Sequence, residues 1–178
     1  MDDFSTPGRT NFFGLNPAES NYIIPGKRAL SSMSPTMVFR GSNTNDDDTT
    51  KLTGTDNLGT LVLSLGASGG PKIITTVLQT ILNHLFVGMP LFQAMAAPRI
   101  HNQLMYHNAA ATNTESAVLP QGPMTEVSER TRLALKKRGH QLVPSNYLGA
   151  VQAVSQDEET NLLTAVSDIR KQGMPAGY

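Results

Sequence analysis

The sequence predicts one α+β domain in which helices mix with mostly antiparallel strands. First, the apolar run Leu61–Leu65 ends in a glycine-rich turn, Gly66–Gly70, and an amphipathic helix follows at once. Second, two pairs of strand-like segments are each joined by a polar stretch, as in β-hairpins. Third, 178 residues with 39% hydrophobic and 16% charged side chains suit a single globular domain with its own core.

The first third of the chain predicts a loop followed by a hairpin. Residues 1–27 are rich in Pro, Gly, Asn and Ser and lack helical or strand periodicity, so we expect a long ordered loop. Met37–Phe39 and Leu58–Leu65 have the character of paired strands. The polar segment 41–57 between them, with Asp46–Asp48 at its tip, is expected to be a solvated loop.

The first helix is expected directly after the glycine turn. Pro71 suits the first helical turn, where a missing N–H group costs no hydrogen bond. Apolar residues then recur every three or four positions until Gly88 and Pro90 end the helix. A short helix over Leu91–Ala97 and an extended segment over His101–Tyr106 are expected next. The apolar positions of the first helix are Ile74, Val77, Leu78, Ile81, Leu82 and Leu85.

The last third of the chain predicts one helix and one hairpin. Thr125 is expected to cap a helix over Glu126–Arg138, and Gly139 is expected to adopt the left-handed conformation that often ends a helix. Gly149–Ser155 and Asn161–Val166 are expected to be two antiparallel strands joined by a polar turn.

The composition argues against several classes of function. Fourteen basic and 14 acidic residues cancel, so no net field favours nucleic acid. The chain has no cysteine, which removes thiol catalysis, disulfides and cysteine-based zinc sites. No apolar run approaches the ~20 residues that span a bilayer, so no membrane segment is expected. The four histidines have no metal-ligand spacing on one helix face, and we expect neither a metal nor a cofactor.

The glycine turn is the strongest candidate for chemistry. Free N–H groups at the start of a helix suit an anion, either a phosphate or the oxyanion of acyl transfer. Pro71 stands where a phosphate-binding P-loop needs a lysine, so an oxyanion hole built from the Gly69 and Gly70 amides fits better. A phosphate-binding module, or a turn needed only for tight packing of strand and helix, remains an alternative.

Two polar segments have groups that suit the ends of an amino acid. Ser31–Ser34 offers hydroxyl groups and an exposed amide to a carboxylate. Asp3, beside Asp2, offers a carboxylate to an ammonium group. From the residues alone, a polar turn leading into a strand and a solvated pair of acids are the simpler explanations of these segments.

Eight segments of the chain stand in an order that one enzyme family shares. They are Met1–Ser5, Pro25–Lys27, Leu30–Thr36, Gly66–Gly70, Ile73–Gln79, Ala97–Arg99, His101–Gln103 and Pro175–Tyr178. Together they resemble the small subunit of γ-glutamyltranspeptidase, also called glutathione hydrolase, from the first residue to the last. The resemblance implies a partial N-terminal-nucleophile hydrolase fold, a four-layer αββα sandwich. Residues 1–178 would be a single partial domain, with 1–27 as a lid-like loop and 28–178 as sheet and helix layers.

The resemblance also implies a reaction and roles for site residues. In this family a precursor cleaves itself, and the new N-terminal threonine attacks the γ-glutamyl amide of glutathione. The glutamyl group then passes to water, an amino acid or a dipeptide. By resemblance, the Gly69 and Gly70 amides would stabilise the oxyanion. Asp3 would bind the substrate's α-amino group, and the Ser31 hydroxyl with the Ser32 backbone would hold its α-carboxylate.

Part of the family's machinery is expected outside this sequence. The threonine nucleophile should lie some tens of residues before Asp3, and the large subunit should supply an arginine for the substrate carboxylate. We therefore expect a C-terminal portion of the small subunit that is inactive alone and needs the large subunit as its partner. The alternative is a non-catalytic protein that binds γ-glutamyl compounds or complements a partner.

Three further expectations follow from the resemblance. Family members lie at the cell surface, outside the cell or in vacuoles, located through the part outside this sequence. Some members place a tyrosine near Phe13, which has no hydroxyl group to donate. Strands beside Leu58–Leu65 come partly from the missing region in the family, so the 178 residues alone should have exposed sheet edges and should aggregate or pack loosely.

Overall fold

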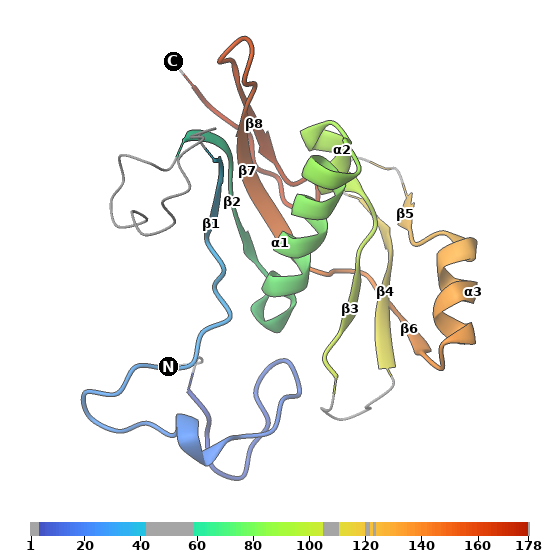
Figure 1. Cartoon of the computed structure of the whole chain (residues 1–178). Coiled ribbons are helices and arrows are strands. Elements are labelled where there is room, and N and C mark those ends of the chain that lie inside the picture. The colour runs from blue at the N-terminus through green and yellow to red at the C-terminus, as the bar shows by residue number, and fades with distance from the viewer. Residues whose placement is uncertain (1–3, 42–58, 105–110, 120–121, 123, 178) are drawn as a thin grey trace, which may run out of the picture.

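A computed structural model describes residues 4–41, 59–104, 111–119, 122 and 124–177. In this part of the chain the strands form two four-stranded sheets, and helices pack beside them (Figure 1). The mixture of helices with mostly antiparallel strands confirms the predicted α+β class.

The first sheet has four antiparallel strands in the order β1-β2-β7-β8. They are β1 (Thr36–Arg40), β2 (Thr60–Ser68), β7 (Ala150–Gln156) and β8 (Leu163–Ser167). Both predicted hairpins are therefore confirmed. The expectation that strands from outside this sequence flank β2 is wrong, because β1 and β7 pair with its two edges. Within the described residues, the edges of this sheet are β1 and β8.

Two helices cover one face of this sheet (Figure 1). A 3₁₀ turn over Gly70–Lys72 leads into α1 (Ile73–Ile81), which continues as a π-helical turn over Leu82–Phe86. The predicted short helix is α2 (Leu91–Ala96). Burial of apolar side chains between helices and sheet supplies the main stabilising term. The core consists of Val62, Leu63, Leu65, Ile73, Val77, Leu91, Met95, Val151 and Ala153.

The second sheet is centred on β4 (Ala111–Val118). It pairs antiparallel with β3 (Ile100–Asn102) and β5 (Met124–Glu126). It also pairs parallel with β6 (Gln141–Ser145), and α3 (Glu129–Lys137) makes the connection from β5 to β6. Neither β4 nor β6 was predicted.

The start of α3 differs from the prediction. Thr125 lies in β5, opposite Ala117 of β4, so its backbone belongs to a strand ladder and not to a helix cap. Ser128 is the cap, and its Oγ accepts a hydrogen bond of 3.2 Å from the Thr131 amide. Gly139 follows the helix at φ +87°, which confirms the predicted left-handed residue.

The N-terminal loop is confirmed over its described residues. From Phe4 onward it contains a short 3₁₀ turn, Glu19–Asn21, and an isolated bridge between Ser5 and Tyr22. Asp2, Asp3, Asp46–Asp48 and His107 lie outside the described residues.

Candidate functional site

A cavity of about 740 Å³ lies beside the glycine turn, at the start of α1. Five parts of the chain line it: the N-terminal loop, the segment Ser68–Lys72, the second sheet with the residues that follow β3, the loop that precedes β7, and Lys171 after β8. Gly69 and Gly70 both line it, so the glycine turn that was predicted as a candidate site borders a cavity.

The turn requires glycine at both positions. Gly69 has φ +145° and Gly70 has φ +60°, conformations that side chains rarely adopt. A Cβ atom on Gly69 would lie 2.8 Å from the Gly149 Cα, and one on Gly70 would overlap the Phe13 ring. Both glycines are therefore needed for tight packing of the backbone, which was one of the alternative explanations of this turn. The same two glycines also line the cavity.

The turn is held through its carbonyl groups. The Lys72 amide donates to Gly69 O at 3.3 Å, and Ser32 Oγ donates to Gly70 O at 2.8 Å. The Gly69 and Gly70 amides donate to no other described residue. Two unused donors on one turn are the arrangement that an oxyanion hole needs.

The serine segment lies against the turn. The bond from Ser32 Oγ to Gly70 O brings this segment to the glycines, and Ser31 is exposed beside it. Ser31 Oγ accepts a hydrogen bond of 3.1 Å from the Met33 amide, and its hydroxyl donates to no residue that the structure describes. The structure thus brings together the four described site residues of the sequence prediction: Ser31, Ser32, Gly69 and Gly70.

The N-terminal loop covers the turn. The Phe13 ring lies over Gly70, where a Cβ atom would be, and packs edge-on against Phe12 at a centroid distance of 5.3 Å. A ligand that reaches the Gly70 amide from this side must displace Phe13.

Three basic residues with no predicted role also line the cavity: Lys72, His101 and Lys171. Lys72 Nζ donates to Tyr147 O at 3.1 Å, and burial lowers the pKa of this lysine. His101 Nδ1 lies 2.8 Å from Thr75 Oγ1, and its Nε2 lies 2.8 Å from Gln103 Oε1. Burial lowers the pKa of His101, which favours the neutral ring. His101 and Gln103 belong to one of the eight segments that resemble the family. That resemblance is the sequence signal that could have marked them as site residues.

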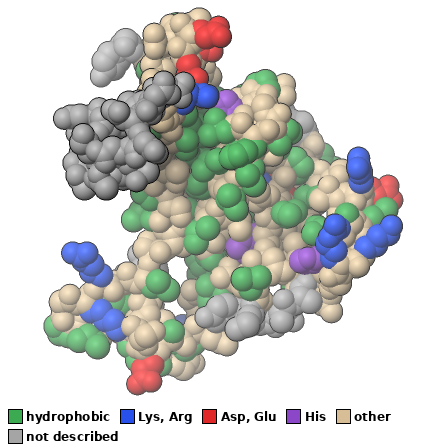
Figure 2. Space-filling view, viewed as in Figure 1, with side chains coloured by type: hydrophobic (Ala, Val, Ile, Leu, Met, Phe, Trp, Pro, Cys, Tyr) green, Lys and Arg blue, Asp and Glu red, His purple; other side chains and the backbone are tan. Residues whose placement is uncertain are grey.

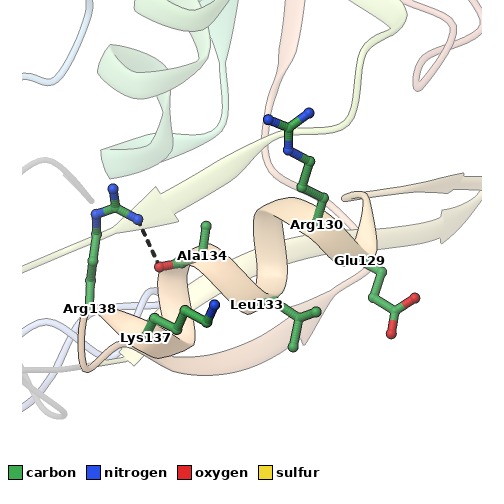
Figure 3. Close-up of a pocket in the computed structure, with 6 residues that line it drawn as sticks. All are labelled: Glu129, Arg130, Leu133, Ala134, Lys137 and Arg138. Atoms are coloured by element: carbon green, nitrogen blue, oxygen red, sulfur yellow. Dashed lines mark hydrogen bonds between the residues drawn. The ribbon is translucent and has the colours of Figure 1, made fainter.

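A second hollow, of about 490 Å³, runs along the outer side of α3 (Figure 3). Arg130, Leu133 and Lys137 line it, and Arg138 donates to the Ala134 carbonyl. No residue of α3 is buried, so this hollow is a solvated helix face and not an enclosed site.

The described residues show neither a metal-binding cluster nor a membrane-spanning helix. They contain no cluster of three or more His, Cys, Asp or Glu side chains that could hold a metal ion. None of their helices has the length and hydrophobicity needed to cross a bilayer.

Comparison with known proteins shows what this arrangement resembles. The sequence profile of the family described as Gamma-glutamyltranspeptidase matches residues 1–178. Glutathione hydrolase 2 of Arabidopsis thaliana is 36% identical over 185 residues, an alignment that covers 100% of this chain and 28% of the relative. Glutathione hydrolase proenzyme 1 of Schizosaccharomyces pombe is 35% identical over 182 residues, covering 100% and 24%. The chain thus spans about a quarter of the length of these curated relatives.

Solved structures agree with the sequence matches. The γ-glutamyltranspeptidase from Pseudomonas nitroreducens, complexed with L-DON, superposes with a TM-score of 0.72 at 31% identity, over 99% of this chain and 78% of that one. A T380A mutant of the Helicobacter pylori enzyme gives 0.70 at 32% identity, over 96% and 78%. These matches confirm the N-terminal-nucleophile hydrolase fold class. The chain belongs to the γ-glutamyltranspeptidase family.

Proposed function

We propose that this chain supplies the oxyanion hole and the glutamyl-binding surface of an enzyme that cleaves the γ-glutamyl amide of glutathione. The observation that carries the proposal is the glycine turn: Gly69 and Gly70 line the cavity, and their amides donate to no other described residue. Relatives named glutathione hydrolase, at 36% and 35% identity over the whole chain, support the same reaction.

The proposed reaction is acyl transfer through a covalent intermediate. A threonine hydroxyl from outside this sequence adds to the γ-carbonyl carbon, and the negative charge that develops on the carbonyl oxygen is bound by the Gly69 and Gly70 amides. The C–N bond then breaks, and the amine leaves with a proton. Water, an amino acid or a dipeptide takes the glutamyl group in the second step. No cofactor is part of this scheme.

The substrate's amino-acid head is proposed to bind beside the turn. The Ser31 hydroxyl and the Ser32 amide would donate to the α-carboxylate, and Asp3 would accept from the α-ammonium group. The 2.8 Å bond from Ser32 Oγ to Gly70 O supports this arrangement, because it fixes the carboxylate donors next to the oxyanion donors. Phe13 would act as the cover of the bound glutamyl group.

The proposal makes a nucleophile-bearing partner necessary. We infer that the 178 residues alone are inactive, and that activity requires the family's large subunit and the threonine-bearing N-terminal strand of the small subunit. We call the combination of these parts with this chain the assembled enzyme.

The test compares the chain alone with the assembled enzyme. One suitable assembly replaces the matching 28% of Arabidopsis Glutathione hydrolase 2 by this chain. With a chromogenic γ-glutamyl anilide, the assembled enzyme should turn over and the 178 residues alone should not. Gly69→Pro removes one oxyanion donor and, because proline cannot adopt φ +145°, also distorts the turn, so kcat should fall by at least about 100-fold.

Two other outcomes would count against the proposal. Turnover by the 178 residues alone would show that the nucleophile lies in this sequence. Glutamate binding by an assembly that never turns over would support the alternative of a non-catalytic γ-glutamyl-binding protein.

A further inference from the structure

The strand ladder between β2 and β7 ends in two glycines that face each other. Its last pair is Ser68 with Ala150, so Gly69 and Gly149 are the next residues on the two strands. Gly149 has φ +88°, and its backbone lies directly against Gly69.

Neither of these glycines has room for a side chain. A Cβ atom on Gly69 would lie 2.8 Å from the Gly149 Cα. A Cβ atom on Gly149 would lie 2.8 Å from Thr76 Oγ1 and 3.0 Å from the Ser68 carbonyl oxygen. Such distances are shorter than van der Waals contact, so a methyl group at Gly149 must push α1 or the end of β2 aside.

Buried side chains hold the backbone on both sides of Gly149. Thr76 Oγ1 donates to the Leu148 carbonyl at 2.6 Å, and Arg99 Nη1 donates to the Gly149 carbonyl at 2.6 Å. Thr76 and Arg99 are 1% and 2% exposed, so water does not compete for these bonds. Two successive carbonyls are therefore fixed, one from α1 and one from the segment before β3.

Arg99 is itself held by a buried carboxylate. Its Nη2 donates to Asp168 Oδ2 at 2.7 Å, and the same oxygen accepts from the Val151 amide at 2.8 Å. Asp168 thus ties the arginine back to the strand that carries Gly149. The closed loop of contacts runs from Gly149 through Arg99 and Asp168 to Val151.

We propose that Gly149 is a positioning residue for the oxyanion hole: its bare Cα, held by Thr76 and Arg99, sets where the Gly69 amide stands. This inference depends on the proposed function, because it gives Gly149 a part in the same acyl transfer. Gly149 does not line the cavity and touches no reacting atom; it acts through Gly69.

Gly149→Ala in the assembled enzyme tests the proposal. We expect kcat to fall by about 10- to 100-fold while KM stays within about twofold, because a misplaced donor affects the transition state most. Gly139→Ala is the matched control, since Gly139 has nearly the same φ, +87°, with no atom within 4 Å of its Cβ position. It carries the same backbone strain and should retain full kcat.

A second readout separates positioning from loss of folding. A glutamate analogue with a boronic acid at the γ position forms a tetrahedral anion on the nucleophile and so fills the oxyanion hole, whereas glutamate does not. Gly149→Ala should raise the inhibition constant of the boronate by at least about tenfold. It should change the inhibition constant of glutamate by less than about twofold. Equal weakening of both ligands would overturn the proposal.

Variants of Thr76 provide a test if Gly149→Ala does not fold. Thr76→Val removes the hydroxyl that holds Leu148 O and should lower kcat, and Thr76→Ser keeps the hydroxyl and should restore it. Unchanged kcat in Thr76→Val would then overturn the positioning role. If the unmodified assembled enzyme does not turn over, the proposed function fails instead, so the two failures are distinguishable.

Discussion

His101 shows how one residue of the cavity is constrained by its neighbours. Its Nε2 lies 2.8 Å from Gln103 Oε1, an acceptor, and its Nδ1 lies 2.8 Å from Thr75 Oγ1, which also forms a hydrogen bond with the Lys72 carbonyl at 3.2 Å. Burial lowers the pKa of His101; the bond to Gln103 opposes this effect, and the nearby Lys72 charge adds to it. The folded protein therefore holds His101 neutral at a pH where the unfolded chain already protonates it.

The sign of the pH effect follows from this difference. When the folded pKa lies below the unfolded pKa of about 6.5, the unfolded state binds more protons, and stability falls as the pH drops below that value. We predict that His101→Gln reduces the loss of Tm between pH 7 and pH 5. Thermal unfolding of wild type and variant across this range measures it. Parallel Tm profiles for the two proteins would contradict the assignment.

At the scale of elements, helices and strands with a regular sequence pattern were predicted correctly. Elements that depend on contacts between distant parts of the chain were not. The periodic apolar residues gave α1, and the polar turn between strand-like segments gave the hairpin of β7 and β8. β4 escaped prediction because its buried positions include Thr112, Thr114 and Glu115, so no apolar alternation marks the inward face. Such polar burial depends on partners that are far away in sequence.

The same limit applies to the site. Gly69 and Gly70 were found because the strand, turn and helix around them are contiguous in the chain. Gly149 lies 80 positions beyond Gly69, and nothing local in its sequence indicates that the two backbones touch. The Phe13 ring over Gly70 likewise brings together distant parts of the chain.

A buried network joins β4 to the C-terminal segment. Glu115 is fully buried and accepts two bonds of 2.6 Å from Arg170, whose other donors reach Asp168 and the carbonyls at the end of α2. Burial raises the pKa of Asp168, but the charge of Arg99 and backbone hydrogen bonds outweigh it and hold the pKa below its ordinary value. The network is fully paired, and the loss of one member leaves a buried charge.

Glu115→Gln should therefore be strongly destabilising. Removing one partner of a buried ion pair costs about 3–5 kcal/mol, because the remaining charge stays buried. Glu126→Gln is the matched control: it breaks the exposed pair with Arg132, and such pairs contribute at most about 1 kcal/mol. Urea denaturation of both variants measures the free energy of unfolding. Similar losses of unfolding free energy in the two variants would show that Glu115 contributes no more to stability than a surface charge.

At the scale of the whole molecule, α1 has two faces. Ile73, Thr76, Val77 and Thr80 face the core, whereas much of the apolar stripe that predicted the helix stays in contact with solvent. Figure 2 shows hydrophobic side chains gathered over this helix. The exposed apolar residues of α1 and of the π-helical turn that continues it, which we call the α1 patch, are Ile74, Leu78, Leu82, Leu85 and Phe86.

A contiguous apolar patch of this kind favours association, whereas isolated exposed leucines are ordinary on protein surfaces. The 178-residue chain alone should therefore form oligomers or aggregates at micromolar concentration. Leu78→Glu, in the middle of the α1 patch, should shift it toward monomer. Leu133→Glu on α3 is the matched control, because Leu133 is 50% exposed and Leu78 is 51% exposed.

Sedimentation velocity of the three proteins at several concentrations decides the matter. Association that responds equally to both substitutions would mean that added charge, and not the α1 patch, controls solubility. A wild-type chain that stays monomeric and unfolds in one sharp thermal transition would contradict the expectation of loose packing. It would also show that β1 and β8, the described edges of the first sheet, need no covering strand.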